Sequence, residues 1–150
     1  MIILIGIAVH LTKRGPMGTL MRALVVKDFG IFGDIRAKRR SARQVVVVSR
    51  ESWEAACSGL RRTAVDWTVR RGNLLITGKT FGPEDVGKRL CIGSVVLLVT
   101  GECTPCPRMD EQVPGLTAAL TPDWRAGVTC MVLAGGELSV PSQVVLLDQP

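Results

Sequence analysis

The chain contains no tyrosine, and aromatic residues make up only 4% of its 150 positions. Proteins that bind single-stranded nucleic acid stack the bases on exposed aromatic side chains, and three Phe and three Trp leave little material for such a surface. The formal net charge of +6 still attracts anions of any kind. Charge alone therefore does not choose among nucleic acid, a phosphorylated small molecule and an acidic membrane.

Long apolar runs and several common motifs are also missing. The apolar start, residues 1–9, is far shorter than the roughly 20 residues of a membrane helix, and it lacks the basic first region of a signal peptide. Five scattered cysteines do not form a disulfide framework. We therefore expect a cytoplasmic protein with free thiols and no membrane partner. No P-loop, GxGxxG, HExxH or paired-carboxylate motif occurs, and no lysine context marks a pyridoxal phosphate site.

What the sequence does contain is a series of short, β-branched apolar segments separated by glycine and proline turns. No linker or internal repeat interrupts them, so residues 1–150 are expected to form one domain. The expected strands are 2–11, 20–26, 43–49, 71–81, 87–101 (one bent strand or a pair) and 142–148, with a hairpin over 127–140 that turns at Gly135 and Gly136. One amphipathic helix is predicted over 49–62, with Ser49 as its N-cap, and a short helical turn over 117–124. The pattern predicts an all-β fold: a closed or partly closed barrel of about seven strands with one or two peripheral helices.

The segment "GECTPCPRMDE", residues 101–111, holds Cys103 and Cys106 in a CxxC spacing. A structural zinc site needs four Cys or His ligands, and no second CxxC is present. A thioredoxin-type dithiol belongs to a βαβ pattern, which this chain lacks. A reactive thiolate needs nearby positive charge, and Arg108 is two residues beyond Cys106. The residues alone leave these alternatives open, together with a chance pair of loop cysteines.

Six stretches, taken in order, resemble the small stand-alone bacterial members of the MOSC domain family, named after the C-terminal domain of molybdenum cofactor sulfurase. The similarity extends over roughly residues 4–147. The stretches are "GIFGD" (30–34), "RQVVVVSRESWEA" (43–55), "RGNLLITG" (71–78), "RLCIGSVVLLVTG" (89–101), "TGECTPCPRMDE" (100–111) and "RAGVTCMVLAGGELSV" (125–140). The resemblance implies a β-rich barrel, in agreement with the strand pattern.

The resemblance also implies a role for the cysteine loop. The family's conserved cysteine is proposed to carry sulfur as a persulfide or to ligate the molybdenum of the molybdenum cofactor. Cys106 matches it, because Cys106 precedes the x-[RK]-[ML] pattern formed by Pro107, Arg108 and Met109. Cys106 is therefore the candidate sulfur carrier and metal ligand, and Cys103 is accessory, either resolving a persulfide or merely solvated. Arg108 would stabilise the Cys106 thiolate or pair with a phosphate.

The other implied site residues are polar and mostly basic. Arg71 and Asn73 match an R-x-N strand, where a guanidinium and an amide suit phosphate and pterin edges. Asp34 matches the family's GD turn, with a structural turn-forming role as the alternative. Arg36 stands where many members have histidine, which puts proton transfer at that position in doubt. Arg36 and Arg43 bound the basic run "RAKRRSAR", either a solvated loop or the rim of a pocket for a phosphorylated ligand.

Three functions compete at this point. The first is a MOSC-type sulfur carrier or molybdenum cofactor binder, whose partners would be a cysteine desulfurase or sulfur acceptor protein and a phosphorylated pterin-like ligand. The first function predicts an exposed Cys106 at a basic pocket lined by Arg71, Asn73 and Arg108. The second is a non-catalytic module with a basic face for nucleic acid or a phosphorylated ligand. The third is a dithiol reductase that uses Cys103 and Cys106.

Overall fold

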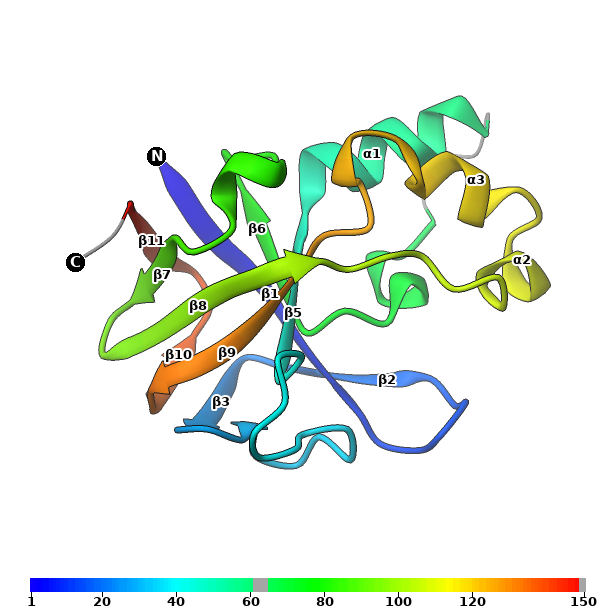
Figure 1. The fold of residues 1–150 in the computed structure, drawn as a ribbon. Helices are drawn as coiled ribbons and strands as arrows, with labels where there is room; N and C mark the ends of the chain where they lie inside the picture. Colours follow the sequence, from blue (N-terminus) through cyan, green and yellow to red (C-terminus); the bar gives the residue numbers. More distant parts are fainter. Residues whose placement is uncertain (61–64, 149–150) are drawn as a thin grey trace.

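A computed structural model of the chain describes residues 1–60 and 65–148. Seven strands close into a mixed β-barrel, because β11 pairs with both β7 and β1. Around the barrel the strands are β1 (Ile2–His10), β11 (Ser142–Leu147), β7 (Arg89–Ile92), β8 (Val95–Glu102), β9 (Val128–Ala134), β5 (Val45–Ser49) and β6 (Leu74–Thr77). The pair β5–β6 is parallel and the other pairs are antiparallel. One further strand, β2 (Met17–Leu20), pairs with β1 outside the closed ring. The predicted barrel of about seven strands is confirmed (Figure 1).

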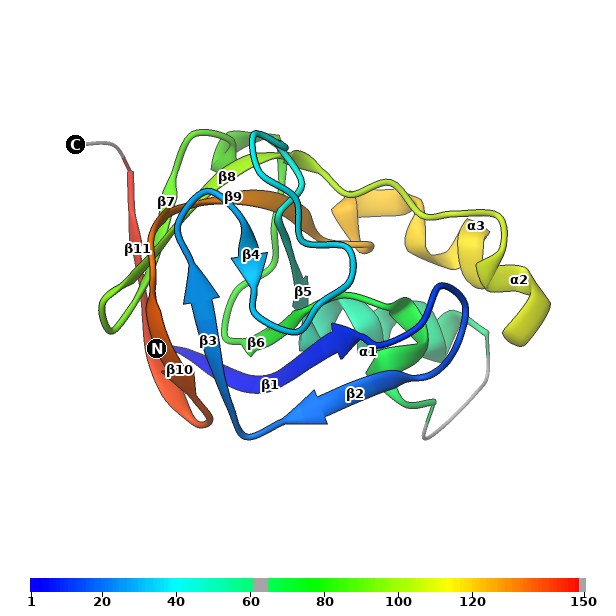
Figure 2. The ribbon, with the colours of Figure 1, turned by 90° about the horizontal axis from the view of Figure 1, so that it is seen from below.

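A smaller sheet of β10 (Gly136–Ser139), β3 (Arg22–Val26) and β4 (Gly30–Ile31) lies beside the barrel (Figure 2). The strand pairing shows that the hairpin predicted over 127–140 is wrong. The strand β9 pairs with β5 and β8, whereas β10 pairs with β3. The reason is a close backbone approach. A Cβ on Gly135 would lie 2.5 Å from the carbonyl oxygen of Val25, so the glycine allows the chain to cross from one sheet to the other.

The valine run of β5 is buried on both faces, as its sequence predicts. All five residues of the strand are buried. Val45 and Val47 belong to the apolar cluster inside the barrel, whereas Val46 and Val48 pack outside it against Leu75. A strand at the centre of the molecule, covered on each side, gives rigid support to residues that follow or face it.

The helices gather at one end of the barrel. The helix α1 (Arg50–Gly59) begins after Ser49, whose hydroxyl accepts a hydrogen bond from the Ser52 backbone N–H at 3.3 Å, so the predicted N-cap is confirmed. Its expected last residues, 61 and 62, lie outside the described residues. The other helical elements are η1 (Trp67–Arg70), η2 (Pro83–Asp85), α2 (Met109–Gln112), α3 (Leu116–Leu120) and η3 (Pro122–Trp124), so three short α-helices stand where one or two were expected. Within the described ranges no helix is long and apolar enough to cross a membrane.

Candidate functional site

The two cysteines of the CxxC segment have opposite environments. Cys103 directly follows β8, its backbone N–H donates to the Gly127 carbonyl at 2.9 Å, and its side chain is only 1% exposed. Pro105 and Pro107 then carry the chain outward, and Cys106 is exposed. Both thiols are free. The expectation that Cys103 might be merely solvated is therefore wrong, because the end of a central strand fixes it inside the protein.

Arg70, which the sequence analysis missed, contacts the buried thiol. This last residue of η1 is only 2% exposed. Its Nη2 donates to the Sγ of Cys103 at 2.7 Å, and its Nε donates to the Ala126 carbonyl at 2.8 Å. Burial lowers the pKa of the Arg70 guanidinium, and the nearby Cys103 sulfur opposes that effect. In the sequence Arg70 stands directly before Arg71, and no local pattern indicates which of two adjacent arginines is buried.

The pairing of Arg70 with a sulfur has an electrostatic consequence. Within the described residues no carboxylate forms an ion pair with Arg70. A guanidinium keeps its charge at all physiological pH values, and a buried charge without a counter-charge is strongly unfavourable. The polarizable Sγ of Cys103 accepts one of the hydrogen bonds of this guanidinium.

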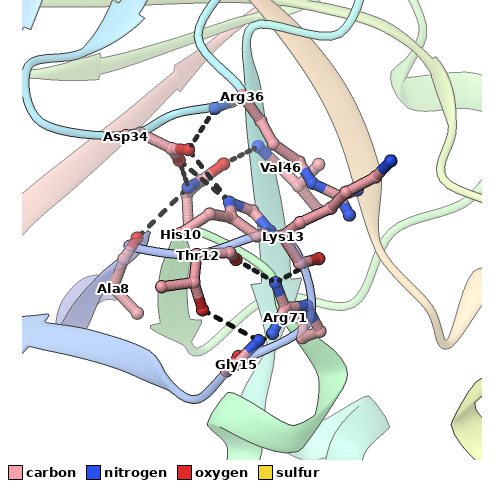
Figure 3. Close-up of polar contacts among 10 residues, drawn as sticks. Ala8, His10, Thr12, Lys13, Gly15, Asp34, Arg36, Val46 and Arg71 are labelled. Atoms are coloured by element: carbon pink, nitrogen blue, oxygen red, sulfur yellow. Dashed lines mark hydrogen bonds and ion pairs between the residues drawn. The ribbon is translucent and has the colours of Figure 1, made fainter.

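Asp34, at the GD turn, is the centre of a second buried cluster (Figure 3). Its oxygens lie 3.0 and 3.1 Å from Nδ1 of His10, and they accept hydrogen bonds from the Arg36 backbone N–H at 2.8 Å and from Nδ2 of Asn73 at 2.6 Å. Burial alone would raise the pKa of Asp34, but these hydrogen bonds outweigh it and lower the pKa. Asp34 is therefore held as a carboxylate, and the GD turn does more than turn the chain.

Asn73 joins this cluster to the barrel wall. Its Oδ1 accepts from the Val46 N–H at 2.9 Å, and its Nδ2 donates to the Ala8 carbonyl at 3.1 Å as well as to Asp34. The side chain is 3% exposed and does not line the pocket described below. Its amide is thus occupied by β1, β5 and Asp34, and any effect on a ligand would be exerted through Asp34.

Arg71 holds the loop between β1 and β2. It follows η1 with a left-handed backbone (φ 63°), and its guanidinium donates to the carbonyl of Gly15 and, at 3.3 and 3.4 Å, to those of Thr12 and Lys13 (Figure 3). Burial lowers the pKa of Arg71. These hydrogen bonds to backbone carbonyls hold the loop in place at the edge of the pocket. Arg71 itself also lines the pocket.

These elements surround a pocket of about 210 Å³ that contains Cys106. Seven basic side chains line it, and we call them the cationic wall. The cationic wall consists of Lys13, Arg14, Arg36, Arg43, Arg70, Arg71 and Arg108. Glu111 is the one carboxylate among the lining residues, which also include His10, Met109 and Gln112. Such a concentration of positive charge around a thiol attracts anions and stabilises a thiolate.

The basic run 36–43 divides between this pocket and the surface. Arg36 and Arg43, at its two ends, line the pocket. Between them, the guanidinium of Arg39 lies 5.7 Å from the ring centre of Phe29, and the backbone N–H of Arg40 donates to Asp28 at 3.1 Å. The run is thus partly a pocket rim and partly a folded surface loop.

Two other cavities help to delimit the site. A neighbouring cavity of about 240 Å³ shares Arg14, Val69, Arg71 and Gln112 with the cysteine pocket, so the two adjoin. A third cavity of about 400 Å³ lies beside α1, near Glu51 and Trp124, and has no cysteine, histidine or lysine in its lining. Among the described residues no three His, Cys, Asp or Glu side chains converge as a metal site would require. Of the three cavities, the one that contains Cys106 has both a cysteine and a histidine in its lining.

Comparison with known proteins agrees with this architecture. The family model for the MOSC domain matches residues 8–145. The structure of YuaD from Bacillus subtilis superposes with a TM-score of 0.79 at 20% sequence identity, covering 97% of this chain and 96% of that one. YiiM from Geobacillus stearothermophilus gives a TM-score of 0.76 at 16% identity, covering 98% and 75% of the two chains, and YiiM from Escherichia coli gives 0.71 at 16% identity, covering 99% and 71%. No curated protein matches by sequence.

Proposed function

The chain belongs to the MOSC domain family, and we propose that it is a sulfur carrier in which Cys106 holds the transferred sulfur as a persulfide. One observation carries this proposal: the exposed thiol of the chain lies in a pocket that the cationic wall lines. A sulfur carrier must be reached by a donor and an acceptor, and its anionic sulfur must be stabilised between the two encounters. Exposure and positive charge meet both needs at Cys106.

The other cysteines are poorer candidates. Cys57, Cys103 and Cys130 are buried, and Cys91 is half-buried in β7 away from the pocket lining. Burial raises the pKa of the Cys130 thiol far above its usual range, which removes it as a nucleophile. Only Cys106 combines access with a charged surrounding.

Binding of the molybdenum cofactor is a second candidate that the same pocket favours. The described residues form no metal site of their own, but a molybdenum already held by its pterin needs little more than one thiolate, which Cys106 supplies. Arg36, Arg43 and Arg108 would hold the phosphate. When bound, such a cofactor supplies two-electron redox chemistry at the metal.

The size of the pocket limits how such a ligand would bind. Pockets that enclose drug-sized ligands have volumes of about 300–1,000 Å³. The cysteine pocket has about 210 Å³, and only together with the adjoining cavity of about 240 Å³ does it reach that range. A phosphorylated pterin would therefore extend past Arg71 into the second cavity and stay partly exposed.

The two remaining functions have less support. Five aromatic side chains are buried or partly buried, and Phe32, 67% exposed, stands alone on the surface, so single-stranded nucleic acid finds no stacking surface. A dithiol reductase would need Cys103 and Cys106 to meet, whereas Cys103 is buried on Arg70. We therefore propose a cysteine desulfurase as donor and a sulfur acceptor protein as partners, in the reducing cytoplasm that a chain without a disulfide framework favours.

Sulfur loading tests the proposal directly. The protein is incubated with a cysteine desulfurase and cysteine, and its intact mass is measured for wild type, Cys106→Ser and the matched control Cys91→Ser. We expect one added sulfur atom on wild type and on Cys91→Ser, and none on Cys106→Ser. An adduct that persists in Cys106→Ser, or no adduct on wild type, contradicts the carrier role. In the second case, retention of an oxidised pterin fluorophore by wild type but not by Arg43→Ala would favour cofactor binding.

A further inference from the structure

His10 is a residue of the cysteine pocket that no motif in the sequence singles out. It is the last residue of β1 and the chain's one histidine. Its side chain is 5% exposed, yet it lines the same pocket as Cys106. The contact with Asp34 joins residues 24 positions apart in the sequence, so only the folded chain reveals it.

The hydrogen bond to Asp34 decides which ring nitrogen can accept a proton. Asp34 is held as a carboxylate and can only accept hydrogen bonds. Nδ1 of His10, at 3.0 and 3.1 Å from its oxygens, must therefore carry a hydrogen. In the neutral imidazole this leaves Nε2 as the bare acceptor. The wall of the pocket thus holds a proton acceptor in a fixed tautomer.

The neighbouring charges show why this acceptor matters. Every member of the cationic wall is a lysine or an arginine, and both stay protonated near neutral pH. Glu111 is the one acid among the lining residues, and an exposed carboxylate is a weak base. The cationic wall can stabilise a thiolate after it forms, but His10 is the lining group suited to remove the proton.

We propose that His10 is the proton acceptor for the Cys106 thiol and that Asp34 is its positioning residue. This inference rests on the proposed role of Cys106 in sulfur transfer. In loading, Nε2 of His10 takes the thiol proton, directly or through one water, and the Cys106 thiolate attacks the outer sulfur of a donor persulfide. The S–S bond of the donor breaks, the Cys106–sulfur bond forms, and the donor leaves as a thiolate that receives the proton from His10. Thiol and persulfide exchange places, so no oxidant or reductant is needed.

The arrangement also accounts for Arg36 at the position where histidine was expected. The backbone N–H of Arg36 donates to Asp34 at 2.8 Å, so residue 36 still contacts this carboxylate. The imidazole is supplied instead by position 10, on the neighbouring strand, and reaches the same carboxylate. The group that accepts the proton is therefore His10, which Asp34 positions, and residue 36 is not needed for this step.

Alkylation kinetics test this role without any sulfur donor. The rate at which iodoacetamide modifies Cys106 is followed by peptide mass spectrometry from pH 5.5 to 9 in wild type and in His10→Asn, whose amide N–H can still donate to Asp34. We expect the rate at pH 6.5 to fall at least about tenfold in His10→Asn and its pH profile to move to higher pH. The rate at Cys91, measured in the same samples, should not change. An unaltered Cys106 profile in a folded His10→Asn protein overturns the proposal.

A measurement on the wild-type protein keeps the test independent of any variant. Because the chain has one histidine, ¹⁵N-histidine NMR reports His10 alone. We expect the Nδ1-protonated tautomer and a titration midpoint that shifts when Cys106 is blocked with methyl methanethiosulfonate. The opposite tautomer, or a midpoint indifferent to blocking, overturns the inference. If both tests succeed but the desulfurase loads no sulfur, the carrier function fails while the coupling of His10 to Cys106 stands.

Discussion

Removing the sulfur of Cys103 should destabilise the fold far more than removing another buried sulfur. Cys103 and Cys130 are 1% and 0% exposed, and Cys103→Ala and Cys130→Ala delete the same atom. The difference is that the Cys103 sulfur is the contact of the buried Arg70 guanidinium, at 2.7 Å. Its loss leaves a charge inside the protein whose one remaining hydrogen-bond partner, among residues 1–60 and 65–148, is the Ala126 carbonyl.

The magnitudes separate the two variants clearly. Loss of a buried sulfur and the small cavity that it leaves should cost about 1–2 kcal/mol in Cys130→Ala. Removing the acceptor of a buried charged donor leaves that donor unsatisfied, which adds about 1.5–3 kcal/mol in Cys103→Ala and nothing in Cys130→Ala. The double variant Arg70→Met/Cys103→Ala removes both partners, so it should cost clearly less than the sum of the two single changes.

Urea unfolding followed by far-ultraviolet circular dichroism measures these differences. The buffer should contain chloride and no phosphate, because phosphate bound in the pocket would replace the sulfur as the hydrogen-bond partner of Arg70. A Cys103→Ala variant within about 1 kcal/mol of Cys130→Ala, or strict additivity in the double variant, would refute the reasoning that the buried guanidinium depends on this sulfur as an acceptor.

Three further predictions concern the carboxylate cluster and the pocket. Because the pKa of Asp34 is lowered in the folded protein, the carboxylate stabilises the fold above its unfolded pKa of about 3.9, and this contribution disappears as the pH falls through the lower folded value. Asp34→Asn should therefore unfold about 1–3 kcal/mol more easily at pH 7, and its stability should approach that of wild type as the pH falls below the folded-state pKa. A stability difference between the two proteins that does not change with pH would contradict the cause given. Asn73→Ala should cost about 2–4 kcal/mol in chemical unfolding, because it strands the Val46 N–H and the Ala8 carbonyl inside the barrel wall; a change under about 0.5 kcal/mol would show that water replaces the amide. Phosphate at ten times its dissociation constant should stabilise wild type by about 1.4 kcal/mol in thermal unfolding at constant ionic strength, and Arg43→Ala should lose most of this gain; an equal gain from chloride would mean that no phosphate site exists.

The barrel could be predicted because its strands carry local signals. The Val45–Val48 run is apolar at every position, so it marks a strand buried on both faces, and the structure covers it on both. Ser49 likewise marks the start of α1. The Gly135–Gly136 pair shows the limit of such signals. Glycines permit a turn, but whether the next strand folds back or crosses to β3 depends on partners far away in the sequence.

The candidate site was only partly predictable. Cys106, Arg108, Arg36, Arg43 and Arg71 were chosen on sequence patterns, and the structure brings all five to the lining of one pocket. Their roles stay predictions. Arg70 and His10 were missed, because a buried arginine and a histidine in an apolar strand have no local pattern that separates them from surface or core residues.

By itself the sequence determined the family, the strand-rich fold and the exposed, proline-flanked cysteine, since each depends on residues close together along the chain. The burial of Cys103 against Arg70, the contact of His10 with Asp34 and the presence of His10 in the pocket of Cys106 became visible only in the folded chain. These pairings join residues 33 and 24 positions apart. They arise because the fold brings the ends of β1 and β8 next to η1 and to the turn after β4, and the low-polarity interior then requires each buried charge to find a partner.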